Sequence, residues 1–126
     1  MVDNRFIIVP MKQTYTVLIA DSRYPAYEQE KSVLEPLGAE LIIEKSDEVQ
    51  KLLPLVKSVD GMLVNLAPVN AELVEAMEKC KCVARYGVGY DNVDTAALKR
   101  KGIWLANVPG YCDEDVSDHA LALLLD

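Results

Sequence analysis

Residues 15–44, YTVLIADSRYPAYEQEKSVLEPLGAELIIE, indicate the class of fold. A short apolar run rich in β-formers opens it, a longer helical pattern follows, and a second apolar run closes it. Gly38 stands where the helical pattern ends, a position that favours a left-handed terminal residue. A strand, a helix and a strand in this order are typical of a βαβ unit with parallel strands.

The same alternation continues along the rest of the chain. Because the strand runs are nearly continuous in Val, Ile, Leu and Ala, we expect helices on both faces of the sheet. Asn70 and Asp94 precede helical runs as N-terminal capping residues, and Gly102 follows one as a left-handed terminus. These patterns predict an α/β domain of three layers with a five-stranded, mostly parallel sheet of flavodoxin-like type. The predicted strands are 15–20, 39–44, 61–65, 82–86 and 103–107, and the predicted helices 27–38, 47–58, 70–80, 95–102 and 116–125.

The composition indicates one ordinary domain. The chain has 126 residues, of which 51% are apolar and 26% charged, and its formal net charge is −7. An acidic chain repels nucleic acid and anionic lipid, so neither is an expected partner. The opening residues contain only four consecutive apolar residues, too few for a membrane span or a secretory signal. We expect residues 1–13 to form an arm or an extra strand.

The three cysteines, Cys80, Cys82 and Cys112, are an odd number, and the C-x-C spacing is poor for zinc. We interpret them as reduced and structural, which predicts a cytoplasmic protein and no metal site.

The segment ARYGVGYDNVD, residues 84–94, begins as a dinucleotide-binding loop would. Gly87 and Gly89 match the first two glycines of G-x-G-x-x-G, but Asn92 occupies the third position. No acidic residue follows roughly 20 residues later to hold a ribose. A cofactor cradle is therefore disfavoured, and two readings stay open: a turn whose backbone amides face an anion, or a tight turn that binds nothing.

Three side chains in or after this loop are candidates for ligand binding or acid/base chemistry. Arg85 is either a bidentate ligand for a carboxylate or a surface cation, and Tyr111 either closes over a ligand or packs. His119 lies inside a helical pattern, where a structural histidine bonded to a neighbour is the better interpretation. The apolar end of that last helix predicts protein on more than one of its flanks.

Residues 85–125 resemble the D-isomer-specific 2-hydroxyacid dehydrogenases. The motif residues occur in register, namely Arg85, Gly87, Gly89, Asp91, Asn92, Asp94, Gly102, Ile103, Asn107, Pro109 and the Ser117-Asp118-His119 run. The resemblance implies that 14–112 form a flavodoxin-like substrate-binding domain. It also implies that 113–126 begin an interdomain helix leading to a Rossmann domain that this chain does not contain.

The resemblance further implies roles for individual residues. The backbone N–H groups of Val88 and Gly89 would hold the carboxylate of a small 2-hydroxy or 2-keto acid, with Val88 also against the nicotinamide, while Arg85 and Tyr111 would line the substrate cleft. The family's catalytic histidine, glutamate and arginine and its cofactor loop lie further downstream. The full-length protein would be a homodimeric enzyme using NAD or NADP, whereas this chain alone would hold no catalytic residue, bind no cofactor and be inactive.

The sequence leaves more than one substrate and more than one function open. Phosphoglycerate-specific members often carry an arginine after the third strand, where this chain has Asn65, which weakens that specificity. The sequence of residues 107–125 is also similar to that of the dehydrogenase-like corepressors, so a sensor role is one alternative. A stand-alone anion-binding module is another. A phosphorylated receiver domain is disfavoured, since Asp21 lacks an acidic neighbour and the third strand ends in Asn65.

Overall fold

The computed structural model describes residues 14–126, and the arm or extra strand predicted for 1–13 lies outside that range. Five strands and five α-helices alternate, with a short 3-10 helix after α1. In chain order they are β1 (Tyr15–Ala20), α1 (Glu28–Leu34), η1 (Glu35–Leu37), β2 (Ala39–Glu44), α2 (Val49–Val56), β3 (Gly61–Val64), α3 (Ala71–Ala76), β4 (Cys82–Arg85), α4 (Thr95–Lys101), β5 (Trp104–Ala106) and α5 (Asp113–Leu125).

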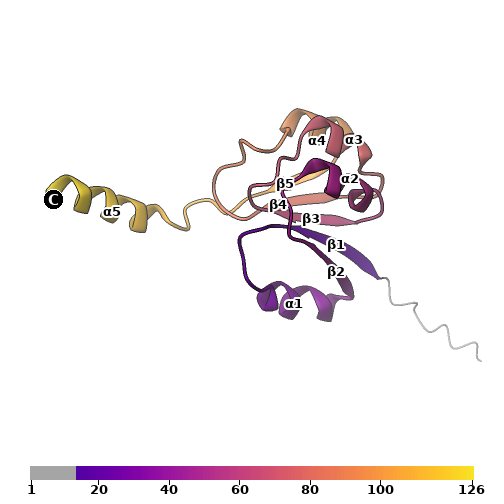
Figure 1. The fold of residues 1–126 in the computed structure, drawn as a ribbon, viewed down its shortest axis with the longest axis horizontal. Helices are drawn as coiled ribbons and strands as arrows, with labels where there is room; N and C mark the ends of the chain where they lie inside the picture. The colour runs from indigo at the N-terminus through magenta and orange to yellow at the C-terminus, as the bar shows by residue number, and fades with distance from the viewer. Residues whose placement is uncertain (1–13) are drawn as a thin grey trace, which may run out of the picture.

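The strands form one sheet in the order β2-β1-β3-β4-β5, and every pairing in the described chain is parallel. The register aligns Leu18 with Met62 and Met62 with Val83 across the three central strands. The predicted α/β fold with a five-stranded parallel sheet is therefore confirmed. Figure 1 shows α1 on one side of this sheet and α2, α3 and α4 on the other.

The two faces of the sheet are covered unequally. Leu18, Met62 and Val83 lie in one continuous buried cluster with apolar residues of α2, α3 and α4, among them Leu73 and Leu98. The apolar side chains of the strands are removed from water in this core, and their burial supplies most of the stabilisation of the fold. On the other face Trp104 of β5 is 78% exposed. Of the two predicted helical layers, the one on the α1 side is thus incomplete over β5.

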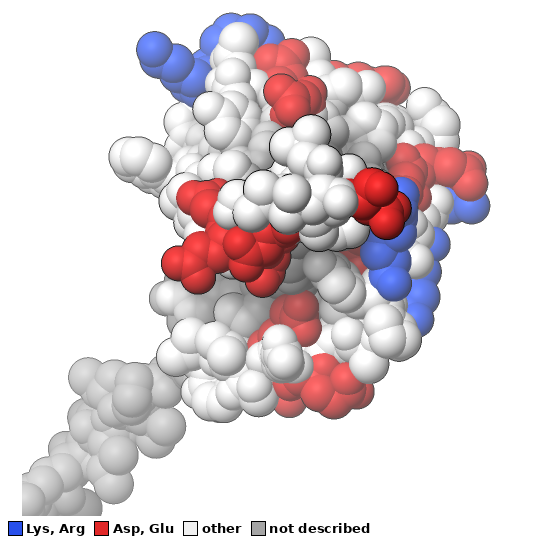
Figure 2. Space-filling model, turned by 90° about the vertical axis from the view of Figure 1, so that its left-hand side faces the viewer, with Lys and Arg blue, Asp and Glu red and all other residues white. Residues whose placement is uncertain are grey.

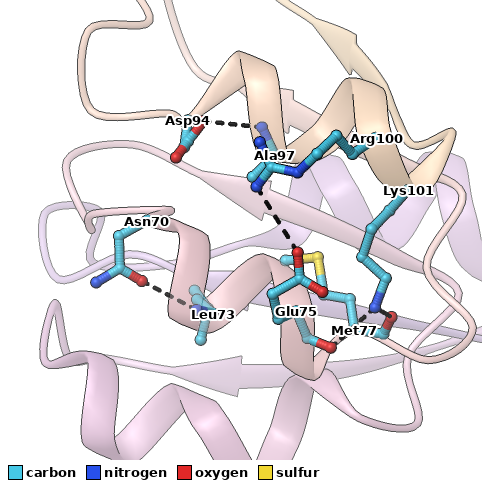
Figure 3. A network of polar contacts seen from close by, with 8 residues as sticks. All are labelled: Asn70, Leu73, Glu75, Met77, Asp94, Ala97, Arg100 and Lys101. Atoms are coloured by element: carbon cyan, nitrogen blue, oxygen red, sulfur yellow. Dashed lines mark hydrogen bonds and ion pairs between the residues drawn. The ribbon is translucent and has the colours of Figure 1, made fainter.

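Hydrogen bonds at the ends of the short helices α3 and α4 hold them in place, and Figure 3 shows these contacts. Asn70 Oδ1 accepts from the Leu73 N–H at 2.9 Å, and Asp94 Oδ1 from the Ala97 N–H at 2.8 Å, so both predicted caps are confirmed. The Lys101 ammonium donates to two backbone carbonyls at the end of α3, those of Glu75 and Met77, at 2.8 and 2.7 Å. These bonds tie α4 to α3. The predicted left-handed termini are also confirmed, at Gly38 (φ 89°) and Gly102 (φ 67°).

The last helix differs from the others. It begins at Asp113 rather than at the predicted residue 116, because Asp113, Glu114 and Asp115 form an acidic first turn that suits a helix N-terminus. None of its residues is buried, and Figure 1 shows it projecting away from the sheet. In 14–126 no helix is long and apolar enough to span a membrane.

Candidate functional site

Four loops meet at the carboxyl edge of the sheet, because parallel strands end on the same side. They follow β1, β3, β4 and β5 and, together with Arg85 at the end of β4, contain the residues predicted to bind substrate. Figure 2 is viewed from the end at which α5 projects, with Asp and Glu near the centre of the view and Lys and Arg nearer its margins. The loop after β5 leads into the acidic first turn of α5, Asp113 to Asp115, so the few donors at this edge are important for any anion.

The Gly87 turn brings two of the predicted residues together. Gly87 has φ +124°, and a Cβ built on it would overlap Nη1 of Arg85 and lie 3.6 Å from Oη of Tyr111. Both side chains therefore lie against the same glycine. The Nε atom of Arg85 is buried without a hydrogen-bond partner in the described structure. Glycine is required here both for its backbone conformation and for the close approach of the guanidinium.

Val88 and Gly89, the next two residues, are exposed, and in the part of the chain described neither backbone N–H donates to a protein acceptor. Their loop is nevertheless held in place by its carbonyls. The Gly87 carbonyl accepts from the Val108 N–H at 2.9 Å, and the Val88 carbonyl from the Asn107 amide at 2.8 Å. With the carbonyls bonded within the protein, the two N–H groups are left available to an external anion.

Asn92, which replaces the third glycine of the dinucleotide pattern, has a different role. Its side-chain amide donates to the backbone carbonyls of Asn65 at 3.1 Å and Ala67 at 2.8 Å. The loops after β3 and β4 are thereby joined, and Asn65 lies beside the glycine loop through its backbone. A third glycine would remove this connection, so the segment is built as a braced turn rather than as a dinucleotide cradle.

Sequence reasoning missed an aromatic pair at the same edge. Tyr86 donates its hydroxyl to Oε1 of Glu30 at 2.7 Å, and burial together with this carboxylate raises the pKa of Tyr86, so the phenol stays protonated. Tyr24 packs edge-to-face on Tyr86 with ring centroids 5.4 Å apart. The sequence feature that could have pointed to them is their place after strands β1 and β4, whose carboxyl ends lie at this edge.

The loop that carries Tyr24 is anchored by the buried carboxylate of Asp21. Its Oδ2 atom accepts from the Tyr24 N–H at 2.9 Å and from the Tyr27 hydroxyl at 3.1 Å. Burial and the adjacent Asp21 raise the pKa of Tyr27 to about 12. Asp21 therefore has a structural role at the site, which the receiver hypothesis did not anticipate.

Together these loops form an open pocket of about 190 Å³ lined by Tyr24, Tyr86, Gly87, Val108 and Tyr111. His119 lies on α5, exposed, and its ring makes no hydrogen bond within the described residues, so the expected bond to a neighbour is not found. In 14–126 no group of three or more His, Cys, Asp or Glu side chains is arranged to hold a metal ion. The chemistry this edge offers is anion binding beside an aromatic pocket.

A family profile for the D-isomer specific 2-hydroxyacid dehydrogenase catalytic domain matches residues 17–122. The chain is 40% identical over 112 residues to a D-3-phosphoglycerate dehydrogenase of Mycobacterium tuberculosis, covering 86% of this chain and 20% of that protein. It is 36% identical over 90 residues to a glyoxylate reductase of Korarchaeum cryptofilum, covering 71% of this chain and 24% of that protein. The chain thus spans a fifth to a quarter of these relatives.

Solved structures agree with the fold. An NAD⁺-bound 3-phosphoglycerate dehydrogenase of Entamoeba histolytica superposes with a TM-score of 0.78 at 24% identity, over 89% of this chain and 38% of that one. A D-lactate dehydrogenase of Aquifex aeolicus, solved with NAD and lactic acid, gives a TM-score of 0.75 at 25% identity over 86% of this chain and 32% of that one.

Proposed function

The chain belongs to the D-isomer-specific 2-hydroxyacid dehydrogenase family, and from this premise we propose that it is the substrate-binding part of an NAD(P)-dependent oxidoreductase that interconverts D-2-hydroxy and 2-keto acids. One observation carries the proposal: the exposed N–H groups of Val88 and Gly89 lack protein acceptors on a turn whose carbonyls are bonded. A substrate carboxylate supplies the acceptors that these donors need.

Arg85 and Tyr111 complete the carboxylate site in this proposal. The Arg85 guanidinium lies against Gly87, one residue before the first donor, and offers the fork geometry that suits a carboxylate. The Tyr111 hydroxyl approaches the same glycine from the loop after β5. Asn65 is placed at the margin by its backbone, as the acceptor for Asn92.

The residues present fit a nicotinamide cofactor on one side only. When bound, NAD or NADP supplies the hydride acceptor or donor for the C2 carbon. The Val88 side chain, 39% exposed beside the carboxylate donors, offers an apolar surface for the nicotinamide. The braced turn at Asn92 is no pyrophosphate cradle, so we propose that the rest of the cofactor is held by a Rossmann domain following α5. The exposed apolar residues of α5 support its role as the interdomain helix.

The same proposal makes this chain alone inactive. Its single histidine, His119, is on the projecting helix and not at the sheet edge, so no imidazole base faces the substrate turn. The full-length protein is proposed to be a homodimer, as the resemblance implies. A cytoplasmic location is proposed from the three free cysteines, two of which have pKa values raised by burial and are unreactive as thiols.

The test is a titration of the 126-residue chain with glycolate, followed through backbone amide NMR shifts. We expect the Val88 and Gly89 signals to move with millimolar affinity, because in this proposal the Rossmann domain forms the other half of the cleft. Gly89→Pro removes one donor and is expected to weaken binding, whereas the control Gly89→Ala keeps the N–H and is expected to bind as before, since a Cβ there meets nothing closer than 3.6 Å.

Other outcomes separate the alternatives. Unmoved Val88 and Gly89 signals would rule out the proposed carboxylate site. Saturable micromolar binding of glycolate would favour a stand-alone anion-binding module, and saturable binding of NAD by this chain would contradict the proposed division between two domains.

A further inference from the structure

The pocket beside the glycine turn shares Gly87 and Tyr111 with the proposed carboxylate site and extends beyond it. It is about 190 Å³ in volume and is lined by Tyr24, Tyr86, Gly87, Val108 and Tyr111. A second hollow of about 540 Å³ toward α1 shares Tyr24 and Tyr86 with it, and its other lining residues are Ala26, Glu28, Gln29 and Glu30. A substrate held by Val88 and Gly89 would have its far end at the smaller pocket, which starts at the residue before them.

The walls of this pocket are aromatic and fixed in place. The Tyr24 and Tyr86 rings pack against each other, and the Tyr86 hydroxyl is committed to Glu30 at 2.7 Å. The backbone of Tyr24 is held by the buried Asp21. Because its hydroxyl is bonded within the protein, Tyr86 presents its ring to the pocket rather than a free donor, and Tyr24 contributes the ring that packs on it. Such a wall favours apolar and aromatic groups.

The charges around the pocket disfavour an anionic group. The pocket itself is lined by no charged residue, and the adjoining hollow is lined by two carboxylates, Glu28 and Glu30. Lys45 approaches the Pro25 carbonyl and lies over the Tyr27 ring, and Arg23 is exposed in the β1–α1 loop. The Arg85 guanidinium lies against Gly87, but in the proposed function it pairs with the substrate carboxylate. A phosphate in the pocket would then have no cation of its own and would lie near the Glu30 carboxylate, which accepts from Tyr86.

We infer that the pocket formed by Tyr24, Tyr86, Val108 and Tyr111 binds the C3 substituent of the 2-hydroxy acid and selects an uncharged apolar or aromatic group over a phosphate. The volume suits a phenyl ring, since an engineered apolar cavity of about 150 Å³ is enough to bind benzene. This inference rests on the proposed function, because it takes the carboxylate to be held by Val88 and Gly89. It names the substrate class that the carboxylate site alone leaves open.

The test compares three acids on the 126-residue chain by amide NMR titration: glycolate, D-phenyllactate and D-3-phosphoglycerate. We expect D-phenyllactate to bind about tenfold more tightly than glycolate, because its phenyl group is removed from water. It should also shift the signals of Tyr24, Tyr86 and Tyr111. D-3-phosphoglycerate should bind no more tightly than glycolate.

Variants locate the effect in the pocket. Tyr24→Ala is expected to reduce D-phenyllactate affinity to that of glycolate and to leave glycolate binding unchanged, while Tyr24→Phe keeps the wall and the preference. Tyr15→Ala is the matched control, since Tyr15 and Tyr24 are both 42% exposed and Tyr15 lies at the opposite end of β1.

Each contrary result has a separate meaning. Equal affinities for glycolate and D-phenyllactate, with Val88 and Gly89 shifting in both, would overturn the pocket assignment and leave the proposed function standing. Tightest binding of D-3-phosphoglycerate would overturn it in favour of a phosphate site. Absence of shifts with all three acids would overturn the proposed function and the pocket assignment together.

Discussion

The helices on either side of β5 in the chain, α4 and α5, have opposite relations to the rest of the molecule. The shorter, α4, has seven residues, buries Ala97 and Leu98, and is capped by Asp94 and ended by Gly102. The longer, α5, has thirteen residues, buries none, and has no side-chain cap. The length and apolar content of a helix therefore do not indicate how much it contributes to the stability of this fold. Contact with the sheet does indicate it, because a short helix is stabilised by removal of its apolar surface from water.

The largest expected effect comes from truncating a leucine in each helix. Leu98→Ala in α4, at a side chain 2% exposed, is expected to lower the free energy of unfolding by about 2–5 kcal/mol, because it leaves a cavity in the core. Leu124→Ala in α5, at a side chain 82% exposed, is expected to change it by less than about 0.5 kcal/mol. Urea denaturation measures both. Equal losses would mean that α5 packs on the domain and that the contrast is wrong.

Alkaline pH offers a second way to separate the sheet body from α5. Burial raises the pKa of Cys80 from 9.0 to about 11, so the folded state holds this proton more tightly than the unfolded state does. Stability is fully present below pH 9 and is lost as the pH rises toward 11, at a slope of about 1.4 kcal/mol per unit at most. Cys80→Ala is expected to reduce the slope measured by denaturation at several pH values. The control Cys112→Ala, next to α5, leaves Cys80 in place and should show the same pH slope as the unaltered chain. An unchanged slope in Cys80→Ala would contradict the assignment of this pH dependence to the Cys80 thiol.

Two glycines with positive φ precede the two helices and sharpen the comparison. Gly87, before α4, has no room for a Cβ beside Arg85, whereas a Cβ at Gly110, before α5, would lie 3.5 Å from the nearest atom, Oδ2 of Asp113. Both alanine variants carry backbone strain, but only Gly87→Ala must also displace Arg85. We expect a loss of about 2 kcal/mol for Gly87→Ala and about 1 kcal/mol for Gly110→Ala, measured by thermal unfolding. The reverse order would show that the turn beside Arg85 is not crowded.

The smallest effect concerns the cap of α4. Asp94→Ala removes the acceptor for the Ala97 N–H and is expected to cost about 1 kcal/mol in unfolding free energy, whereas Asp94→Asn keeps an acceptor and most of the stability. The same measurement on Cys112→Asn, which adds a capping side chain to α5, should leave the main unfolding transition unchanged. A stabilised main transition in Cys112→Asn would show that α5 unfolds together with the sheet.

Sequence patterns were sufficient for the regular parts of this fold. The five strands, the caps at Asn70 and Asp94 and the glycine termini at Gly38 and Gly102 each follow from local chemistry, such as an apolar run, a side-chain acceptor or a residue without Cβ. The helical periodicity alone places the start of α5 at residue 116, three residues late, because an acidic first turn resembles a polar loop in sequence, whereas the family resemblance implied a helix from 113. The unequal covering of the sheet faces was also missed, since strand composition does not show where helices lie.

The candidate site divides in the same way. Arg85, Val88, Gly89 and Tyr111 were selected from a motif, and their roles as ligands stay predictions that the titrations test. The structure shows that Arg85 and Tyr111 share the Gly87 turn. Tyr24, Tyr86 and Glu30 were not selected, because their association joins residues far apart in the chain.

Local periodicity and a contiguous motif are enough to predict the alternation of strands and helices, the parallel direction of the strands and the family. The strand order, the bracing of the glycine turn by Asn92 and Asn107, and the tyrosine-walled pocket beside it are seen only in three dimensions. Hydrogen bonds and ring contacts between separate loops exist only after the sheet has brought the ends of its strands to one edge.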